Sequence, residues 1–340
     1  MQAADILSDP HWFPVHFDLQ QDTLTFLQTT RDSLSKGAFL DHRFYQQTDR
    51  FHKVRLSHAL NCPLERHDMS WIFHTAFCAS TLMARALDVH GKTLALKEPD
   101  ILMQLANTLR MAKREGRSLD AIKPVCDCIF SLLSRRFSDQ ERVLIKPTNP
   151  ANFLMTFVLG RGDPALFMTS PLKVFLTSIL RKGEEGAAFI RSLYNIFALD
   201  GTGLSKISER DALRFTDMQI TAMIWQHQHE DMTDVAKMYP DQVRAIDGLS
   251  FPLDPTRHMK AASDFLKLGL GDEDIAQNAN GTVFEQNAKF SDQSFDTATR
   301  DAENARLENM FADRLTATIN WQAKLDLGRD YTYLPAAPLL

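Results

Sequence analysis

The sequence of 340 residues predicts an α/β fold, in which helices cover a doubly wound parallel sheet of about five strands. Two observations predict it. Short apolar segments alternate with longer segments in which apolar residues recur at helical spacing, as in consecutive strand–helix–strand units. The short segments are apolar on both faces, which is typical of strands covered by helices on both sides. They are "WIFHT" (71–75), "TLALK" (93–97), "VLIKP" (143–147), "ALFMT" (165–169) and "VRAID" (243–247).

The segments around these strands follow in chain order. Residues 1–65 are irregular, with three prolines and clustered aromatic residues, and we expect an N-terminal arm of short helices and extended pieces laid over the core. The polar, aperiodic residues 275–300 predict a loop. The arm is followed by an α/β domain (66–274), and a loop with a C-terminal helix (275–340) completes the same domain. Helical spacing predicts helices at 101–114, 119–137, 150–160, 172–182, 184–199, 209–231, 255–268 and 301–325.

Composition narrows the class of function. The net charge of −5 argues against a general nucleic-acid binder, because such proteins carry a basic surface. Residues 271–340 hold 12 acidic and 6 basic residues, so the rest of the chain is nearly neutral, which suits a small anionic ligand. Four cysteines are too few for a disulfide scaffold, and the first residues do not read as a signal peptide. No apolar run approaches the ~20 residues of a membrane span, so we expect a cytoplasmic protein.

Polar residues follow the predicted strands at the point where each strand ends. Ligands of open α/β sheets bind beyond these carboxyl ends, so the residues there are candidates for a functional site. Two lysines, one carboxylate and several hydroxyl groups are predicted to converge on this edge. The residues are His74-Thr75, Lys97-Glu98, Lys146 with Thr148 and Asn149, Thr169-Ser170, and Asp247.

The first strand leads into the loop "HTAFCAST" (74–81) and a helical pattern that ends at Gly91. Ser80 or Thr81 can cap this helix, and the free N–H groups of a helix N-terminus bind anions. Small residues at Ala79 and Ser80 allow a phosphate to approach. The loop lacks the glycines and the Lys-Ser/Thr pair of a nucleotide kinase, which disfavours hydrolysis of ATP or GTP. The alternative is a capped strand-to-helix turn without a ligand.

Five stretches together resemble the sulfotransferase family. The stretch "HTAFCASTLMARALD" (74–88) resembles its phosphosulfate-binding loop, with Phe77 in place of a basic residue and Ala79 in place of a glycine. The others fall in the family's order and extend to about residue 270. The resemblance implies a P-loop-type sheet, the cofactor 3′-phosphoadenylyl sulfate, and a small-molecule or peptide acceptor. "DPHWFP" (9–14) also resembles the start of some bacterial sulfotransferase-like proteins. The other four stretches are "LALKEPDIL" (94–102), "VLIKPTNPANFL" (143–154), "ALFMTSPLKVFLTSIL" (165–180) and "VRAIDGLSFPLDPTRHMKAASDFLKLGL" (243–270).

The resemblance also implies roles for single residues. Lys97 and Lys146 would grip the sulfate or the bridging oxygen, and Glu98 would take the proton of the acceptor hydroxyl. Glu98 could instead pair with either lysine. The loop would cradle the 5′-phosphate and the 165–180 stretch the 3′-phosphate, although Thr169 stands where the family has an arginine. The cofactor-binding residues would be His74, Thr75, Cys78, Ala79, Ser80, Thr81, Thr169, Lys173 and Ser178.

Two other functions stay open. The departures at Phe77, Ala79 and Thr169 suggest a catalytically silent relative that binds a protein partner. A phosphotransferase with a divergent loop is a third, less favoured hypothesis. His227 and His229 lie two apart in a predicted helix and therefore diverge, so we expect surface or partner-facing histidines and no metal site.

Overall fold

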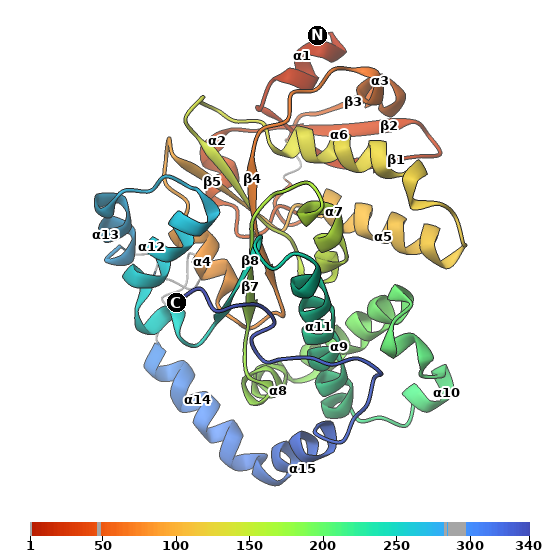
Figure 1. The fold of residues 1–340 in the computed structure, drawn as a ribbon, viewed down its shortest axis with the longest axis vertical. Helices are drawn as coiled ribbons and strands as arrows, with labels where there is room; N and C mark the ends of the chain where they lie inside the picture. Colours follow the sequence, from red (N-terminus) through yellow and green to blue (C-terminus); the bar gives the residue numbers. More distant parts are fainter. Residues whose placement is uncertain (1, 46–48, 282–283, 285–296) are drawn as a thin grey trace.

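A five-stranded parallel sheet lies at the centre of the computed structural model, which describes residues 2–45, 49–281, 284 and 297–340 (Figure 1). The predicted α/β class and its five strands are confirmed. Neighbouring strands are parallel and follow the order β5-β6-β4-β7-β8. The strand that comes first in the sequence, β4, is therefore the central one. The switch point beside β4, where such sheets bind ligands, lies at the strands' carboxyl ends. The strands are β4 (Met69–His74), β5 (Thr93–Lys97), β6 (Arg142–Lys146), β7 (Ala165–Thr169) and β8 (Val243–Asp247).

Both faces of the central sheet are covered by helices, which explains why its strands are apolar throughout. Trp71 stacks on Phe73 and meets Phe130 edge-on on the face covered by α5 (Asp100–Arg114), α6 (Lys123–Leu133) and α7 (Met155–Leu159). Ile72 points to the opposite face, where it packs with residues of α4 (Ser80–Ala86) and α12 (Pro255–Leu266). The alternation along β4 therefore supplies two separate apolar cores.

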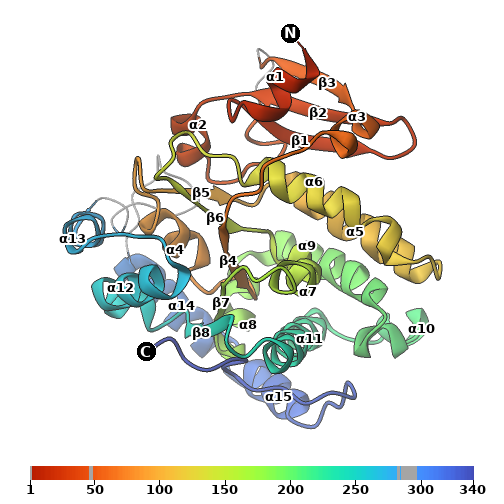
Figure 2. The ribbon, with the colours of Figure 1, turned by 45° about the horizontal axis from the view of Figure 1, so that its top comes forward.

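The N-terminal arm contains a second sheet that the sequence did not predict. Its three strands are antiparallel, in the order β1-β2-β3, and α5 and α6 lie between this sheet and the central one (Figure 2). Pro14 lies within the first strand, at a shift in the register, where the missing N–H is tolerated. The elements are α1 (Ala3–Ser8), β1 (Trp12–Asp18), β2 (Thr23–Gln28), α2 (Arg31–Lys36), β3 (Phe51–Arg55) and α3 (Leu56–Asn61).

Arg135 joins this arm to α6. Its Nη1 donates hydrogen bonds to the carbonyl oxygens of Ile6, Leu7 and Asp9 at 2.9, 3.1 and 2.9 Å, and its Nη2 donates to that of Trp12. These carbonyls lie in the last turn of α1 and in the residues after it, and the carbonyls at a helix end have no partner within the helix. Burial lowers the pKa of Arg135 to about 10, which still leaves the guanidinium charged at neutral pH.

Four of the remaining helices, α8 (Leu172–Arg181), α9 (Gly183–Phe197), α11 (Asp217–Met238) and α15 (Ala312–Gln322), supply most of a third apolar cluster beyond β7. The predicted helix 209–231 is two helices, because Thr216 caps a new start through a reciprocal pair of hydrogen bonds with Gln219. The predicted helix 301–325 is likewise two, namely α14 and α15. The predicted loop 275–300 is wrong at both ends, because α13 extends into it to Ala279 and α14 begins at Thr297; its residues 282–283 and 285–296 lie outside the described residues. Among the residues that the structure describes, no helix combines the length and apolar character needed to cross a bilayer. The further helices are η1 (Leu119–Ala121), η2 (Asn149–Leu154), α8 (Leu172–Arg181), α9 (Gly183–Phe197), η3 (Ala198–Asp200), η4 (Gly203–Lys206), α10 (Glu209–Ala212), α11 (Asp217–Met238), η5 (Phe251–Leu253), α13 (Asp272–Ala279), α14 (Thr297–Met310) and α15 (Ala312–Gln322).

Candidate functional site at the carboxyl edge of the sheet

The loop between β4 and α4 has an unusual backbone. Three of its residues have left-handed φ angles, namely Ala76 (73°), Phe77 (53°) and Ala79 (58°). Each costs on the order of 1–3 kcal/mol for a residue other than glycine, and such strain concentrates at ligand-binding loops. The loop thus takes a tight, left-handed course without the glycines that phosphate loops ordinarily use.

Two contacts hold the loop in this shape. The Ala76 N–H donates to Nδ1 of His74 at 3.0 Å, so Nε2 of His74 carries the proton and donates to the carbonyl oxygen of Pro147 at 3.0 Å. On the other side, a Cβ atom at Gly248 would lie only 2.3 Å from the carbonyl oxygen of Cys78. Position 248 therefore requires glycine, and the loop is clamped between the ends of β6 and β8. His74 positions the loop through both of its ring nitrogens.

The start of α4 offers unpaired donors. Within the described chain, no backbone carbonyl accepts from the N–H groups of Ala79, Thr81 or Leu82. The side chains of Ser80 and Thr81 are buried beside them. Burial raises the pKa of the Cys78 thiol despite hydrogen bonds from Ser80, so this cysteine stays a thiol. These groups form a set of donors that suits an anion.

The two predicted lysines are neighbours, but their ammonium groups have different partners. Lys97 and Lys146 are register partners in β5 and β6, so they project from the same face of the sheet. Lys146 Nζ lies 2.5 Å from Oε1 of Glu98, which itself has a left-handed φ of 54°. The structure therefore brings Lys146 and Glu98 together, and it does so beside the loop, since Pro147 accepts from His74.

Lys97 belongs to a separate buried group. Its Nζ donates to the carbonyl oxygens of Ser35 at 2.7 Å and Ala95 at 3.1 Å, and it lies 3.8 Å from Asp88. Asp88 is also paired with Arg31, at 2.8 Å. Burial lowers the pKa of Lys97 to about 8. Its observed contacts tie α2 of the arm to the edge of the sheet.

The residues expected around a 3′-phosphate are spread over different surroundings. The Thr169 hydroxyl donates to the carbonyl oxygen of Tyr333 at 3.2 Å. Lys173 is about half exposed and pairs with Glu308 of α14 at 2.7 Å, while Ser178 is buried on α8. Phe77, in the place of a basic residue, packs edge-on against two phenylalanines of α8 and α9. The described residues therefore form no cluster of positive charge around the expected 3′-phosphate position.

Residues 332–340, which we call the strap, lie over this edge, a position that no sequence pattern predicted (Figure 1). The strap pairs with β8: Ala245 N–H donates to the oxygen of Ala337, and Leu339 N–H to that of Ala245, both at 2.9 Å. Tyr333 crosses the end of β7 at Thr169. Two surface cavities of about 380 and 440 Å³ lie elsewhere, beside η4 and at the amino ends of β5 and β6.

Near this edge lie five buried polar atoms without a hydrogen-bond partner in the described part of the chain, one of them the Tyr333 hydroxyl of the strap. Each leaves a cost of about 1–3 kcal/mol unless a ligand or water satisfies it. Their elements are linked by contacts: Asn152 donates to the His74 carbonyl at 2.9 Å, and Trp225 donates to the Ser170 carbonyl at 2.8 Å. The other four atoms are Thr75 Oγ1, Asn152 Oδ1, Ser170 Oγ and His229 Nε2.

His229 is fully buried on α11, so the expected surface position is wrong, as it is for His227. Its Nδ1 donates to the carbonyl oxygen of Trp225 at 2.7 Å, which leaves Nε2 as a bare acceptor. The ring lies 3.9 Å from Trp225 and 6.2 Å from Tyr333, between centroids. Burial lowers the pKa of His229 to about 4, so the imidazole is neutral at physiological pH.

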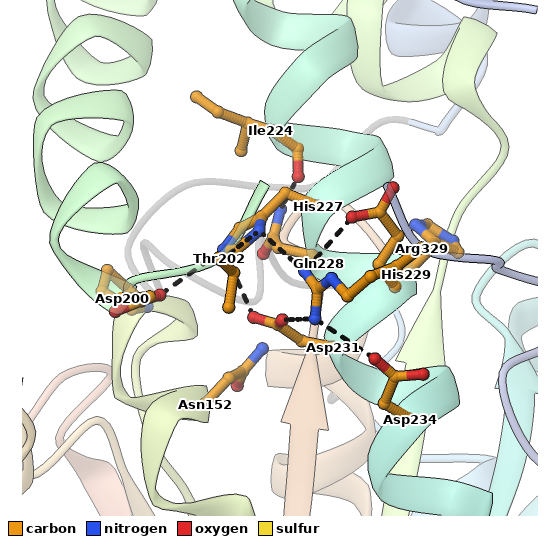
Figure 3. A network of polar contacts seen from close by, with 12 residues as sticks. Asn152, Asp200, Thr202, Ile224, His227, Gln228, His229, Asp231, Asp234 and Arg329 are labelled. Carbon is orange, nitrogen blue, oxygen red and sulfur yellow. Dashed lines mark hydrogen bonds and ion pairs between the residues drawn. The ribbon is translucent and has the colours of Figure 1, made fainter. Parts of the chain in front are cut away.

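A network of ion pairs on α11 holds the chain just before the strap (Figure 3). His227 Nε2 lies 3.4 Å from Asp200 and 3.2 Å from Asp231, so the three could reach one metal ion. However, Arg329 donates to Nδ1 of His227 at 3.2 Å, which places the imidazole proton on Nε2. Arg329 also pairs with Asp231 at 2.5 Å, and Arg110 pairs with Asp200. Arginines thus already balance both carboxylates, and we interpret the network as an anchor for Arg329.

Comparisons with known proteins give neighbours at low similarity. No protein-family model matches the chain, and no curated protein matches it. Two similar solved structures are sulfotransferases. A sulfotransferase domain from the curacin biosynthetic pathway is 13% identical, with a TM-score of 0.40, over 73% of this chain and 99% of that one. The sulfotransferase from Alicyclobacillus acidocaldarius is 13% identical, with a TM-score of 0.36, over 73% and 97%. At such TM-scores this likeness carries no argument about the present chain.

Proposed function

We propose that this protein is a sulfotransferase-like enzyme, which transfers a sulfuryl group from 3′-phosphoadenylyl sulfate to a hydroxyl of a small-molecule or peptide acceptor. The proposal is carried by the left-handed loop at the carboxyl end of the central strand, beside the Lys146–Glu98 pair. A strained loop with unpaired N–H groups next to a buried cation suits a phosphosulfate. The five family-like stretches of the sequence support the same reaction.

The donor end of the cofactor fits the residues present. The N–H groups of Ala79, Thr81 and Leu82 and the unpartnered Thr75 hydroxyl would hold the 5′-phosphate. The bound cofactor would supply the activated sulfuryl group. The 3′-phosphate of the cofactor fits less well, because the Thr169 hydroxyl already donates to the Tyr333 carbonyl oxygen and the Lys173 ammonium already pairs with Glu308. Since each charge-assisted hydrogen bond contributes roughly 1.5–3 kcal/mol, we expect binding to be weak.

The protein's own groups have the following roles in this proposal. Transfer forms a bond between the acceptor oxygen and sulfur and breaks the bond between sulfur and the phosphate oxygen. Lys146 stabilises the negative charge that develops on the leaving oxygen, as a fixed cation in a buried site does. Glu98 accepts the proton of the acceptor hydroxyl. Lys97, given its contacts with Ser35 and Asp88, acts on this site only through its charge.

Thermal unfolding with the product nucleotide, 3′-phosphoadenosine 5′-phosphate, tests the proposal. We expect the nucleotide to raise the Tm, and Thr81→Ala and Lys146→Met to reduce that rise. Lys324→Met, at an exposed lysine, is the matched control and should behave as the unaltered protein does. The absence of any rise at millimolar nucleotide would refute a cofactor site of this kind.

A second candidate is a catalytically silent binding protein on the same scaffold. It is favoured by Phe77, which packs against phenylalanines where the family has a basic residue. Isotopically labelled cofactor distinguishes the two. The enzyme should transfer sulfate to a phenol or an alcohol, or slowly to water, and Glu98→Gln should lower that rate. Nucleotide binding without transfer to any of these acceptors would favour the silent scaffold.

A further inference from the structure

We propose that the strap, residues 332–340, is an autoinhibitory element that occupies the cofactor site and must leave before the cofactor binds. The inference rests on the proposed function, because it concerns the regulation of that same site. The strap covers the carboxyl edge with its own backbone: the carbonyl oxygen of Tyr333 takes the hydrogen bond of Thr169, a residue assigned to the cofactor. The Tyr333 phenol lies near Asp247, and burial together with this carboxylate raises its pKa.

The strap is a poor permanent cover for the groups beneath it. Thr75, Ser170 and His229 keep buried polar atoms that the strap does not satisfy. Folded proteins leave few such atoms, and those they leave often have a ligand or water partner. A ligand with hydroxyl and phosphate groups would satisfy atoms of this kind, whereas the one polar side-chain group that the strap brings here, the Tyr333 phenol, makes no hydrogen bond with them and is itself buried without a partner in the described chain. With the strap in place, these unpartnered atoms therefore raise the free energy of the folded protein, and binding of a polar ligand can remove that unfavourable contribution.

The contacts are distributed so that the strap can leave while the residues before it stay. Arg329 pairs with Asp231 at 2.5 Å, Glu230 at 3.2 Å and Asp234 at 3.4 Å, all on α11 (Figure 3). Beyond this anchor, the strap is held by single hydrogen bonds at the backbone of residues 332, 333, 337 and 339. Its side-chain packing comes from Tyr333, Ala336 and Leu339, which are only partly buried against the apolar clusters. Within the strap only Pro335 is buried. The strap would therefore begin to separate directly after Arg329, because the residues that follow make few contacts with the rest of the protein.

A reversible lock tests the strap as a gate. Ala245 and Pro338 face each other in a bridge between β8 and the strap, so Ala245→Cys with Pro338→Cys should form a disulfide. The background is Cys62→Ser, because the other three native cysteines are buried. We expect the oxidised form to bind 3′-phosphoadenosine 5′-phosphate at least tenfold more weakly in calorimetry, and dithiothreitol to restore binding. Pro338→Cys alone is the control. Equal affinity in the oxidised and reduced forms would overturn the proposal.

Hydrogen exchange without any ligand separates a failure of the strap from a failure of the proposed function. The amides of Ala245 and Leu339 report on the strap, and that of Phe167 in β7 reports on the sheet. We expect the Leu339 amide to exchange at least a hundredfold faster than the Phe167 amide. Equal rates would mean that the strap opens only on global unfolding, which refutes the gate. If neither the oxidised nor the reduced form binds nucleotide, the proposed function is refuted instead.

Discussion

Replacing His229 with asparagine tests how completely the carboxyl edge excludes water. Asparagine keeps a side-chain N–H that can donate to the Trp225 carbonyl, as Nδ1 of the histidine does, but it cannot be protonated. Burial lowers the pKa of His229 from 6.5 to about 4. Below pH 6.5 the unfolded chain therefore binds a proton that the folded chain does not, and stability falls until about pH 4. Above pH 6.5 the histidine contributes no pH dependence.

The size of the effect follows from the two pKa values. Their difference corresponds to about 3 kcal/mol in total, of which roughly 2 kcal/mol is lost between pH 6.5 and pH 5. Many carboxylates and other histidines also titrate as the pH falls, so the informative quantity is the difference between the unaltered protein and His229→Asn.

Urea unfolding followed by tryptophan fluorescence at pH 7.5 and pH 5 measures this difference. We expect the unaltered protein to lose about 2 kcal/mol more than His229→Asn does over that interval. His42→Asn, at an exposed histidine, is the matched control and should follow the unaltered protein. If His229→Asn loses as much stability as the unaltered protein, then His229 is hydrated in solution, and the closed edge described here is wrong.

Three further predictions concern the groups that hold the site in place. The pKa of Lys97 is about 8 in the folded protein and 10.5 in the unfolded chain, so the unfolded chain binds the extra proton between these values. The free energy of unfolding should therefore rise by about 2 kcal/mol from pH 8 to pH 9.5. Urea midpoints should show this rise, and Lys97→Met should lack it. Gly248→Ala forces a Cβ atom onto the Cys78 carbonyl and should cost roughly 1–3 kcal/mol in calorimetry, whereas Gly271→Ala, with its nearest contact at 3.5 Å, should not. Arg135→Met leaves several carbonyl oxygens unpaired and should lower the free energy of unfolding by roughly 3 kcal/mol. Proteolysis within residues 1–65 should also become faster, and an unchanged cleavage rate would contradict the idea that Arg135 holds the arm in place.

The central sheet was predictable because each of its strands is indicated by a short, contiguous sequence segment. Five apolar segments of strand length, separated by helical spacing, determine the strands, and the geometry of parallel sheets then places Lys146 and Glu98 at one edge. Their pairing was among the predicted alternatives. The direction of the Lys97 ammonium was not predictable, because its acceptor at Ser35 belongs to an arm whose fold had been predicted as irregular.

The arm and α11 were misjudged for related reasons. Pro14 reads as a strand breaker, and only the register shift at that point, which depends on the partner strand, makes it tolerable. The polar run around His227 and His229 reads as a solvated helix face. Its side chains are instead buried because distant residues pair with them, such as Arg329 about a hundred positions later. Sequence patterns detect apolar burial well and detect paired polar burial poorly.

The Arg135 clamp has a consequence for the order in which the chain assembles during synthesis. The carbonyl oxygens that it binds lie 123 to 129 positions earlier in the chain. The N-terminal sheet therefore emerges from the ribosome long before the residue that ties it down, and it must wait in an open form with exposed strand edges. The interval closes only when Arg135, which follows the end of α6, has been synthesised and has left the ribosome. A pause in translation just before residue 135 should leave the nascent chain at its most vulnerable to aggregation and to chaperone binding.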